Sequence, residues 1–380
     1  SEFEEFTASG SETQPPALPA QPDDCVIGYT SGTTGKPKGA VGTHSNLIVG
    51  GFIHAREWEL RSDDVVFATT PMAHRTGLSR LASSFQFDTP VVMQPRFDAE
   101  NAVELIEREG ITIMGCVPTI VRMMLPHIEE RPEAVKTLRL VSATGELFPE
   151  VLRKRLFAAA PHVGLYSFLA QTEGGVLLSV MPQDQDFKPK AMGAPIPGVE
   201  IKLVDENLKE VAQGENGEIL VRCGEPGQYT VMREYFRNPQ ATREAFTEDG
   251  WFRTGDVGYG DEDGYYYFAD RAKDMIVTGG LNVYSKEVEL ALLDHAAVDD
   301  AAVYGVPDQE FGEAIMACIQ LKPGGKAEVA DMIEHCRERI ASYKKPKHVR
   351  FIDELPRTSS GKILKYQLKQ EFAAENEPSR

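Results

Sequence analysis

The sequence predicts an α/β fold in which a layered α/β large domain contains a small β-rich subdomain and is followed by a small α/β C-terminal domain. Short apolar runs such as "VVFATTPMA" and "ITIMGCV" alternate with helix-like runs such as "NAVELIERE". This alternation is typical of a parallel sheet covered by helices. From about 193 to 270 the pattern changes to short β segments with turns, including "GEILVRC" and "GYYYFAD", which predicts the β-rich part.

Taken in order, the chain begins with residues 1–24, which are rich in Pro, Ser, Ala and acidic residues and are predicted to be a disordered linker or tail. The large domain is expected over residues 25–272, with "CVIGYT" as the first strand of its parallel sheet. Residues 273–380 form the C-terminal domain, in which Ser285 is expected to cap the helix "KEVELALL".

Composition excludes several classes of protein. Lys and Arg number 40 against 58 Asp and Glu, giving a formal charge of −18, which disfavours nucleic acid or an anionic membrane as partner. The five scattered cysteines contain no C-x-x-C pair, so neither a disulfide framework nor a zinc ribbon is indicated. With no apolar run of about 18 residues to span a bilayer, a soluble, cytoplasmic protein is expected.

The segment "YTSGTTGKPKGAV", residues 29–41, has the chemistry of a phosphate-binding loop. Its glycines let backbone N–H groups approach an anion, and its hydroxyl groups and lysines add donors and charge. It differs from a Walker loop because two residues, not four, separate Gly32 from Gly35. The alternative is a solvated turn between a strand and a helix, and this segment alone leaves both interpretations open.

Two further segments decide between them. "DGWFRTGDVGYGDEDGYYYFADRAKDMIVTGGLNVYSKEVE", residues 249–289, and "LPRTSSGKILKYQL", residues 355–368, together with the loop, resemble the adenylate-forming superfamily of acyl-CoA synthetases, luciferases and peptide-synthetase adenylation domains. The resemblance extends from Cys25 to Leu368. It implies an ATP-dependent carboxylic acid–CoA ligase of the fatty-acid–CoA ligase type, which forms an acyl-adenylate, releases pyrophosphate and then makes an acyl-CoA thioester with ATP, Mg²⁺ and CoA.

The resemblance assigns nucleotide contacts to several residues. Asp256 in "TGD" resembles the carboxylate that accepts hydrogen bonds from both ribose hydroxyls, with Arg271 as its companion. "SATGEL" resembles the loop that covers adenine, with Thr144, Gly145 and Glu146 at its tip. The loop resembles the clamp on the β- and γ-phosphates; its residues are Thr30, Ser31, Gly32, Thr33, Thr34, Gly35 and Lys38.

Catalytic residues are implied in the same way. Lys362 in "SSGKILK" resembles the lysine that the C-terminal domain, a mobile lid, inserts beside the carboxylate and α-phosphate during adenylation. Lys273 matches the hinge about which that domain rotates. The rotation brings the Gly279-Gly280 loop to the site, where the absent side chains leave room for pantetheine.

Thr172 and Glu173 in "FLAQTEGG" match the family's Thr-Glu pair, whose glutamate helps to hold Mg²⁺. The preceding residues are Leu169 and Ala170, where family members have Tyr-Gly with the aromatic ring on adenine. Tyr166 is either a substitute for that ring or a core residue.

His74 in "PMAHRTGL" matches the position near the acyl carboxylate. The adjacent Arg75 is interpreted as a surface or interdomain charge, with pairing to a second carboxylate of the substrate as the alternative.

Relatives carry a long N-terminal subdomain before the phosphate loop, which this chain lacks. We therefore expect exposed apolar surface in the α/β layers, and a complementary N-terminal segment or a homo-oligomer as partner. Two alternative functions remain at this point: an enzyme that adenylates acids to load a carrier-protein thiol, and a catalytically incomplete nucleotide-binding fragment.

Overall fold

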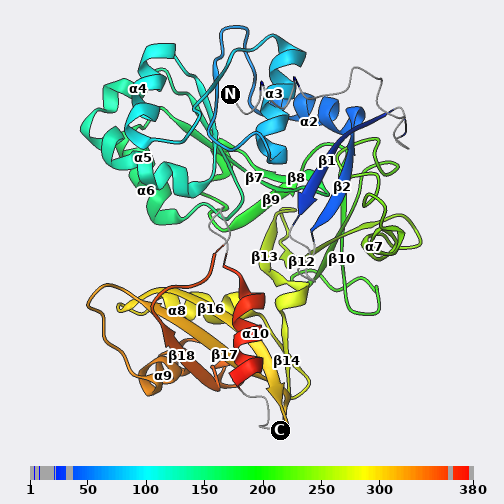
Figure 1. The fold of residues 1–380 in the computed structure, drawn as a ribbon, viewed down its shortest axis with the longest axis vertical. Helices are drawn as coiled ribbons and strands as arrows, with labels where there is room; N and C mark the ends of the chain where they lie inside the picture. Colours follow the sequence, from blue (N-terminus) through cyan, green and yellow to red (C-terminus); the bar gives the residue numbers. More distant parts are fainter. Residues whose placement is uncertain are drawn as a thin grey trace.

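The computed structural model describes residues 4, 8, 21, 23–30, 37–357 and 363–375. Its main element is a mixed sheet of eleven strands in the order β10-β11-β12-β13-β9-β8-β7-β6-β5-β3-β4 (Figure 1). In chain order these strands are β3 (Val66–Ala68), β4 (Val91–Met93), β5 (Ile113–Cys116), β6 (Leu140–Thr144), β7 (Gly164–Gln171), β8 (Gly175–Val180), β9 (Ala191–Pro195), β10 (Glu200–Val204), β11 (Gly217–Arg222), β12 (Phe252–Gly260) and β13 (Tyr266–Arg271).

Strands β3 to β7 pair in parallel, whereas β8 to β13 pair antiparallel. The β segments predicted between about 193 and 270 are therefore strands, and they extend the same sheet. The helices and short 3₁₀ turns of this part are α2 (His44–Glu57), α3 (Arg75–Phe87), α4 (Ala99–Glu109), α5 (Pro118–Glu130), η1 (Pro132–Val135), α6 (Glu150–Ala159), η2 (Pro182–Asp184), α7 (Pro239–Ala245) and η3 (Ala272–Asp274).

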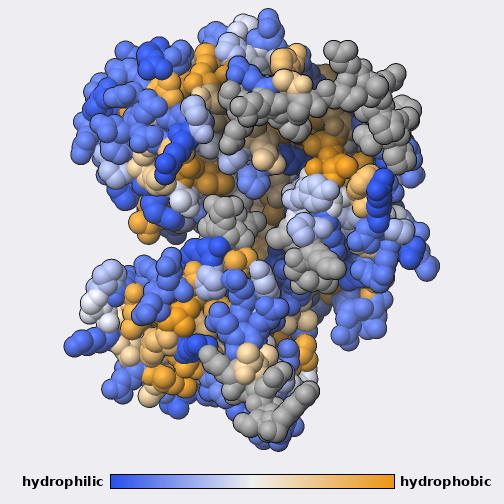
Figure 2. Space-filling view, viewed as in Figure 1, coloured by the Kyte–Doolittle hydropathy of each residue, from blue (hydrophilic) through white to orange (hydrophobic). Residues whose placement is uncertain are grey.

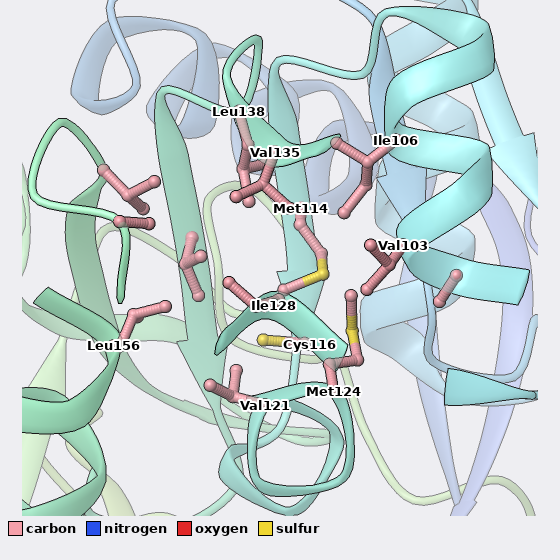
Figure 3. Packing of buried hydrophobic residues seen from close by; sticks show 14 of the residues in the cluster. Val103, Ile106, Met114, Cys116, Val121, Met124, Ile128, Val135, Leu138 and Leu156 are labelled. Atoms are coloured by element: carbon pink, nitrogen blue, oxygen red, sulfur yellow. The ribbon is translucent and has the colours of Figure 1, made fainter. Parts of the chain in front are cut away.

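The inner parallel strands β3, β5 and β6 are buried on both faces. On β5, Met114 and Cys116 point into a core formed with α4 and α5, as Figure 3 shows. Ile113 instead belongs to a second core that includes Ile53 of α2. Because successive side chains of a strand point to opposite faces, one short strand serves two layers.

The "CVIGYT" run is not a strand of the parallel sheet, contrary to the prediction. It lies in β1 (Asp24–Thr30), which forms a separate antiparallel pair with β2 (Lys38–Thr43). The outer edge of β2 is hydrogen-bonded to residues 233–236 through backbone bonds such as Phe236 N–H to Gly39 C=O, at 2.7 Å. The prediction failed because β1 pairs with the next strand of its own hairpin, and that strand pairs with a segment far along the chain.

The C-terminal residues form a second sheet, in the order β15-β14-β17-β16 with β18 paired to β17. Helices α8 and α9 pack on one face of this sheet, and α10 packs on the other. In Figure 2 an indentation separates this part from the large sheet and its helices. The elements are β14 (Ile276–Thr278), β15 (Leu281–Val283), α8 (Ser285–Leu293), β16 (Val298–Asp308), β17 (Gly312–Leu321), α9 (Val329–Arg339), η4 (Ser342–Lys344), β18 (His348–Ile352) and α10 (Lys365–Glu375).

Ser285 does not cap α8 as predicted. It is the first residue of the helix, and Tyr284 occupies the N-cap position without a side-chain hydrogen bond. The Ser285 hydroxyl donates to Asp270 of β13 instead, because a carboxylate from the neighbouring sheet already accepts the N–H groups at the start of this helix. Among the described residues, no helix is long and apolar enough to cross a membrane.

Candidate functional site

The predicted phosphate loop joins the two strands of the β1–β2 hairpin, not a strand and a helix. Thr30 and Lys38 face each other in the strand register at its base. Between them, Ser31, Gly32, Thr33, Thr34 and Gly35 lie outside the described residues. The Thr30 hydroxyl donates to Glu173 Oε1 at 3.1 Å, so the base of the loop contacts the predicted Mg²⁺ carboxylate.

Tyr235 completes this group, and sequence reasoning missed it. Its hydroxyl donates to the same Glu173 Oε1 at 2.9 Å, and Lys38 Nζ lies 5.0 Å from the centre of its ring. Burial and the neighbouring Glu173 carboxylate raise the pKa of Tyr235, so the phenol stays protonated and acts as a donor. No local motif marks Tyr235, because its partner lies 62 residues earlier in the chain.

Thr172 is held by a neighbour that the sequence analysis misinterpreted. Arg75 is not a surface charge, because its guanidinium is bonded to two main-chain carbonyls. Its Nη1 donates to the Thr172 carbonyl, and its Nη2 donates to the Thr230 carbonyl at 2.8 Å. Burial lowers the pKa of this guanidinium to about 10, and its two bonds tie the β7–β8 turn, which carries Glu173, to the segment that contains Thr230.

Gly28 of the β1–β2 hairpin packs closely against this turn. A Cβ on Gly28 would lie 2.7 Å from Thr172 Cγ2, so glycine is needed for the hairpin to approach the turn. His74 occupies the N-cap of α3 without a side-chain capping bond and is exposed. Since Arg75 follows it and reaches Thr172, His74 lies at the edge of the sheet where β7 ends.

Asp256 and Arg271 form the predicted pair. They oppose each other in the β12–β13 register, and Arg271 Nε lies 2.9 Å from Asp256 Oδ1. Asp256 is 1% exposed. Its other oxygen accepts a hydrogen bond from Gln171 Nε2 at 2.6 Å. Gln171 was also missed, although it lies within "FLAQTEGG". It binds Asp256 and lies two residues before Glu173 in the chain.

Thr144, Gly145 and Glu146 lie at the carboxyl end of β6, beside β7. The Thr144 hydroxyl donates to the Phe168 carbonyl at 2.9 Å and is buried, whereas Gly145 and Glu146 are exposed. Gly145 has φ +97°, a conformation that favours glycine and turns the chain away from the strand. Tyr166, in contrast, is fully buried with its hydroxyl bonded to Glu57, so its use as an adenine-stacking ring is wrong.

The remaining candidates belong to the C-terminal part of the chain. Lys273 is exposed in η3, directly after β13. Gly279 and Gly280 form the β14–β15 turn with φ +58° and +77°, and the described contact of this turn is with Phe311. Lys362 lies outside the described residues, in a segment whose ends are joined by a bridge between Arg357 and Ile363.

Comparison with known proteins gives consistent matches. A family model described as AMP-binding enzyme matches residues 1–236, and one described as AMP-binding enzyme C-terminal domain matches residues 287–362. The sulfoacetate–CoA ligase of Cupriavidus necator is 38% identical over 358 residues, which cover 93% of this chain and 68% of that protein.

Solved structures agree. ATP-bound MatB from Rhodopseudomonas palustris superimposes with a TM-score of 0.84 at 31% identity, covering 99% of this chain and 73% of that one. The o-succinylbenzoate CoA synthetase of Bacillus subtilis, in complex with ATP and a magnesium ion, gives a TM-score of 0.80 at 31% identity over 90% and 69% of the two chains. These matches confirm the predicted α/β class with a smaller C-terminal part.

Proposed function

Because the chain belongs to the AMP-binding enzyme family, which confirms the resemblance seen in its motifs, we propose that it is an ATP-dependent carboxylic acid–CoA ligase. It forms an acyl-adenylate with release of pyrophosphate and then transfers the acyl group to CoA. CoA is the acyl-accepting substrate. ATP is a substrate as well, and Mg²⁺ accompanies it.

One observation carries the proposal: Gln171 at the end of β7 and Glu173 two residues later contact the two predicted nucleotide sites. Gln171 donates to Asp256, while Glu173 accepts from Thr30 at the base of the loop. A ribose at Asp256 and phosphates at the loop therefore lie on either side of one turn. ATP carries these two groups at its two ends.

The residues fit Mg²⁺. A single carboxylate, Glu173, with two neutral donors on one oxygen leaves the other oxygen for a cation that also binds substrate phosphates. When bound, Mg²⁺ neutralises phosphate charge. Thr30 and Tyr235 orient the carboxylate that receives it.

The remaining roles follow from place and chemistry. The loop residues 30–38 clamp the pyrophosphate, Asp256 with Arg271 binds the ribose, and Thr144 to Glu146 cover adenine. His74 lies at the acyl carboxylate. Attack of that carboxylate on the α-phosphorus brings two anions together, so positioning and positive charge supply most of the catalysis.

The C-terminal residues 273–380 serve both half-reactions in this proposal. Lys362 neutralises charge during adenylation. Rotation about Lys273 then replaces it with the Gly279-Gly280 turn for thioester formation. A two-part chain with an exposed connection at η3 is suited to such a movement.

The proposal also includes a cellular location and a binding partner. We infer a reducing, cytoplasmic location from five free cysteines, four of them buried. We also infer that a complementary segment or a second copy covers the exposed apolar side chains Ile48, Phe52 and Phe85 of α2 and α3. Light scattering, with and without Phe85→Ser, tests the second copy: a monomer in both proteins excludes it.

The experiment that tests the activity is carboxylate-dependent ATP–pyrophosphate exchange across fatty, aromatic and dicarboxylic acids. Lys362→Ala should abolish exchange while sparing acyl transfer from preformed acyl-adenylate to CoA. Lys369→Ala, on α10, is the matched control and should retain both steps. Exchange that is absent with every acid, or equal loss of both steps in Lys362→Ala, contradicts the assignment.

A further inference from the structure

Arg80 of α3 is a buried cation without an acid to balance it. The residue is 1% exposed. Its Nη1 donates to the Thr76 carbonyl at 3.2 Å, but its Nε and Nη2 have no hydrogen-bond partner within the described part of the chain. The Trp58 ring, 5.3 Å from the guanidinium carbon, covers one side.

Two other arginines of this protein have acceptors for their guanidinium groups. Arg139 donates to both oxygens of Asp64 and to two backbone carbonyls. Arg75 has two carbonyl acceptors. A guanidinium removed from water without acceptors is costly, and burial lowers the pKa of Arg80 to about 10. The charge therefore needs an acceptor that the described residues do not supply.

The Arg80 guanidinium lies against β5 at Gly115, which has no side chain. A Cβ on Gly115 would lie 1.7 Å from Arg80 Nε, so any other residue there would displace the arginine. Gly115 is one residue from the carboxyl end of β5, and its neighbour in the β6 register is Ser142. Since directly paired residues share a face of the sheet, the Ser142 side chain lies beside the guanidinium.

Ser142 adds a second unsatisfied group. Its Oγ is buried and has no hydrogen-bond partner among the described residues. The same is true of Trp58 Nε1 and of Nδ1 of His54, whose ring stacks on Trp58. The nearby acid, Glu57, is already bonded to the Tyr166 hydroxyl. The Arg80 guanidinium thus has two nitrogens without an acceptor, beside a serine hydroxyl that can donate a further hydrogen bond.

The position of the cluster connects it to the proposed acyl site. His74 is the N-cap of the helix that carries Arg80, and the Arg80 side chain reaches back along this helix to the carbonyl of Thr76, two residues after His74. An acid whose reacting carboxylate lies at His74 would extend between α3 and the sheet. The rotatable bonds of Arg80 let its guanidinium withdraw from the space over Gly115 as a substrate enters.

We propose that Arg80 and Ser142 form an anion-binding subsite in the acyl pocket, and that the acid substrate carries a second anionic group, a carboxylate or a sulfonate. This inference rests on the proposed ligase function. It transfers the recognition of a second anion from Arg75, which binds two main-chain carbonyls, to Arg80. Arg80 is a specificity-determining residue, because its charge-assisted hydrogen bonds select among acids.

The test compares acids that differ only at the end remote from the reacting carboxylate. Propanoate, malonate and sulfoacetate form one matched set; butanoate with succinate and pentanoate with glutarate form two others. ATP–pyrophosphate exchange gives kcat/KM for each acid. In at least one set the wild-type enzyme should prefer the acid with a second anion by about tenfold or more, because a monocarboxylate leaves buried donors unpaired. The malonate and sulfoacetate arms distinguish carboxylate from sulfonate.

Arg80→Met should lower that preference about tenfold or more while keeping or raising kcat/KM for the monocarboxylate. Arg80→Lys should retain part of the preference, and Ser142→Ala should lose a smaller part. Arg153→Met is the matched control, because Arg153 is a buried arginine of α6 and its loss should not change the ratio. Because Arg80→Met removes an uncompensated buried charge, its thermal midpoint should equal or exceed that of the wild type.

An unchanged ratio in Arg80→Met, or a wild-type preference for the monocarboxylate in every set, overturns the inference. Exchange with monocarboxylates alone would still support the ligase function. If no acid supports exchange, the ligase function fails. Calorimetric binding of malonate and sulfoacetate then decides the subsite: binding lost in Arg80→Met supports it, and equal or absent binding in both proteins refutes it.

Discussion

Asp270, near the end of β13, accepts hydrogen bonds from the backbone N–H and the hydroxyl of Ser285, the hydroxyl at 3.1 Å. Lys365 of α10 donates to that hydroxyl at 2.8 Å and pairs with Glu289 of α8 at 2.7 Å. One carboxylate of the large sheet thus holds the start of α8 and, through Ser285, contacts α10. The two sheets are joined by a buried polar network.

Asp270→Ala should lower the free energy of unfolding by about 1–3 kcal/mol, because it leaves buried N–H groups at a helix start without an acceptor. Burial raises the pKa of Asp270 because desolvation disfavours the carboxylate. The loss of stability in Asp270→Ala should therefore be smaller than for a solvent-exposed carboxylate that caps a helix with the same geometry. Urea denaturation at neutral pH measures it. Asp299→Ala, at an exposed carboxylate, should change stability by less than about 0.5 kcal/mol, and equal effects of the two variants would contradict the role of Asp270.

Tyr235→Phe should weaken the Mg²⁺ dependence of exchange. In the proposed site the phenol orients Glu173 through its hydrogen bond, and loss of such a partner costs about 10- to 100-fold in metal affinity. Titrating MgCl₂ at fixed ATP measures the shift. Tyr229→Phe removes a hydroxyl that donates to the Pro197 carbonyl and serves as control; an unchanged Mg²⁺ profile in Tyr235→Phe argues against its positioning role.

Gly280→Ala should slow thioester formation and spare adenylation. Both Gly280 and Gly324 have positive φ, with no atom within 4 Å of an added Cβ, so each alanine should cost about 1–2 kcal/mol of stability. Gly324→Ala therefore matches the backbone strain away from the proposed turn. Equal rates of acyl transfer to CoA in the two variants would show that the turn has no part in that step.

Stability should fall below pH 6.5 because of His54. Burial, with the nearby Arg80, lowers the pKa of His54 from 6.5 to about 3. Between these values the unfolded chain binds a proton that the folded protein does not, so the free energy of unfolding decreases by up to about 1.4 kcal/mol for each unit of pH. Chemical denaturation from pH 5 to 7 measures the slope. His54→Gln should flatten it, and His44→Gln, at an exposed histidine, should not.

The sequence was most informative where function depends on neighbouring residues. Thr172 and Glu173, or Asp256 within "TGD", could be identified because each motif is continuous in the chain. Gln171 lies inside a quoted motif and was still missed, because its partner is on another strand. Periodicity likewise predicted the α/β layers, since each layer repeats a local pattern.

Long-range backbone contacts explain the errors. Arg75 was misassigned because its acceptors are main-chain carbonyls, which no side-chain pattern records. "CVIGYT" reads as a buried strand from its composition, but its partner is β2. No sequence pattern indicated that Arg80 is buried, because its burial depends on the absence of a side chain at Gly115, which lies on a different element.

The bonds between β2 and residues 233–236 also have a consequence for synthesis on the ribosome. The hairpin emerges early, but the backbone groups that cover its outer edge appear about 190 residues later, a delay of about 10–40 s at ordinary rates of translation. During that interval β2 presents unpaired amides to other chains. The nascent protein should therefore depend on chaperones at this point, and slower translation should lower the yield of native enzyme.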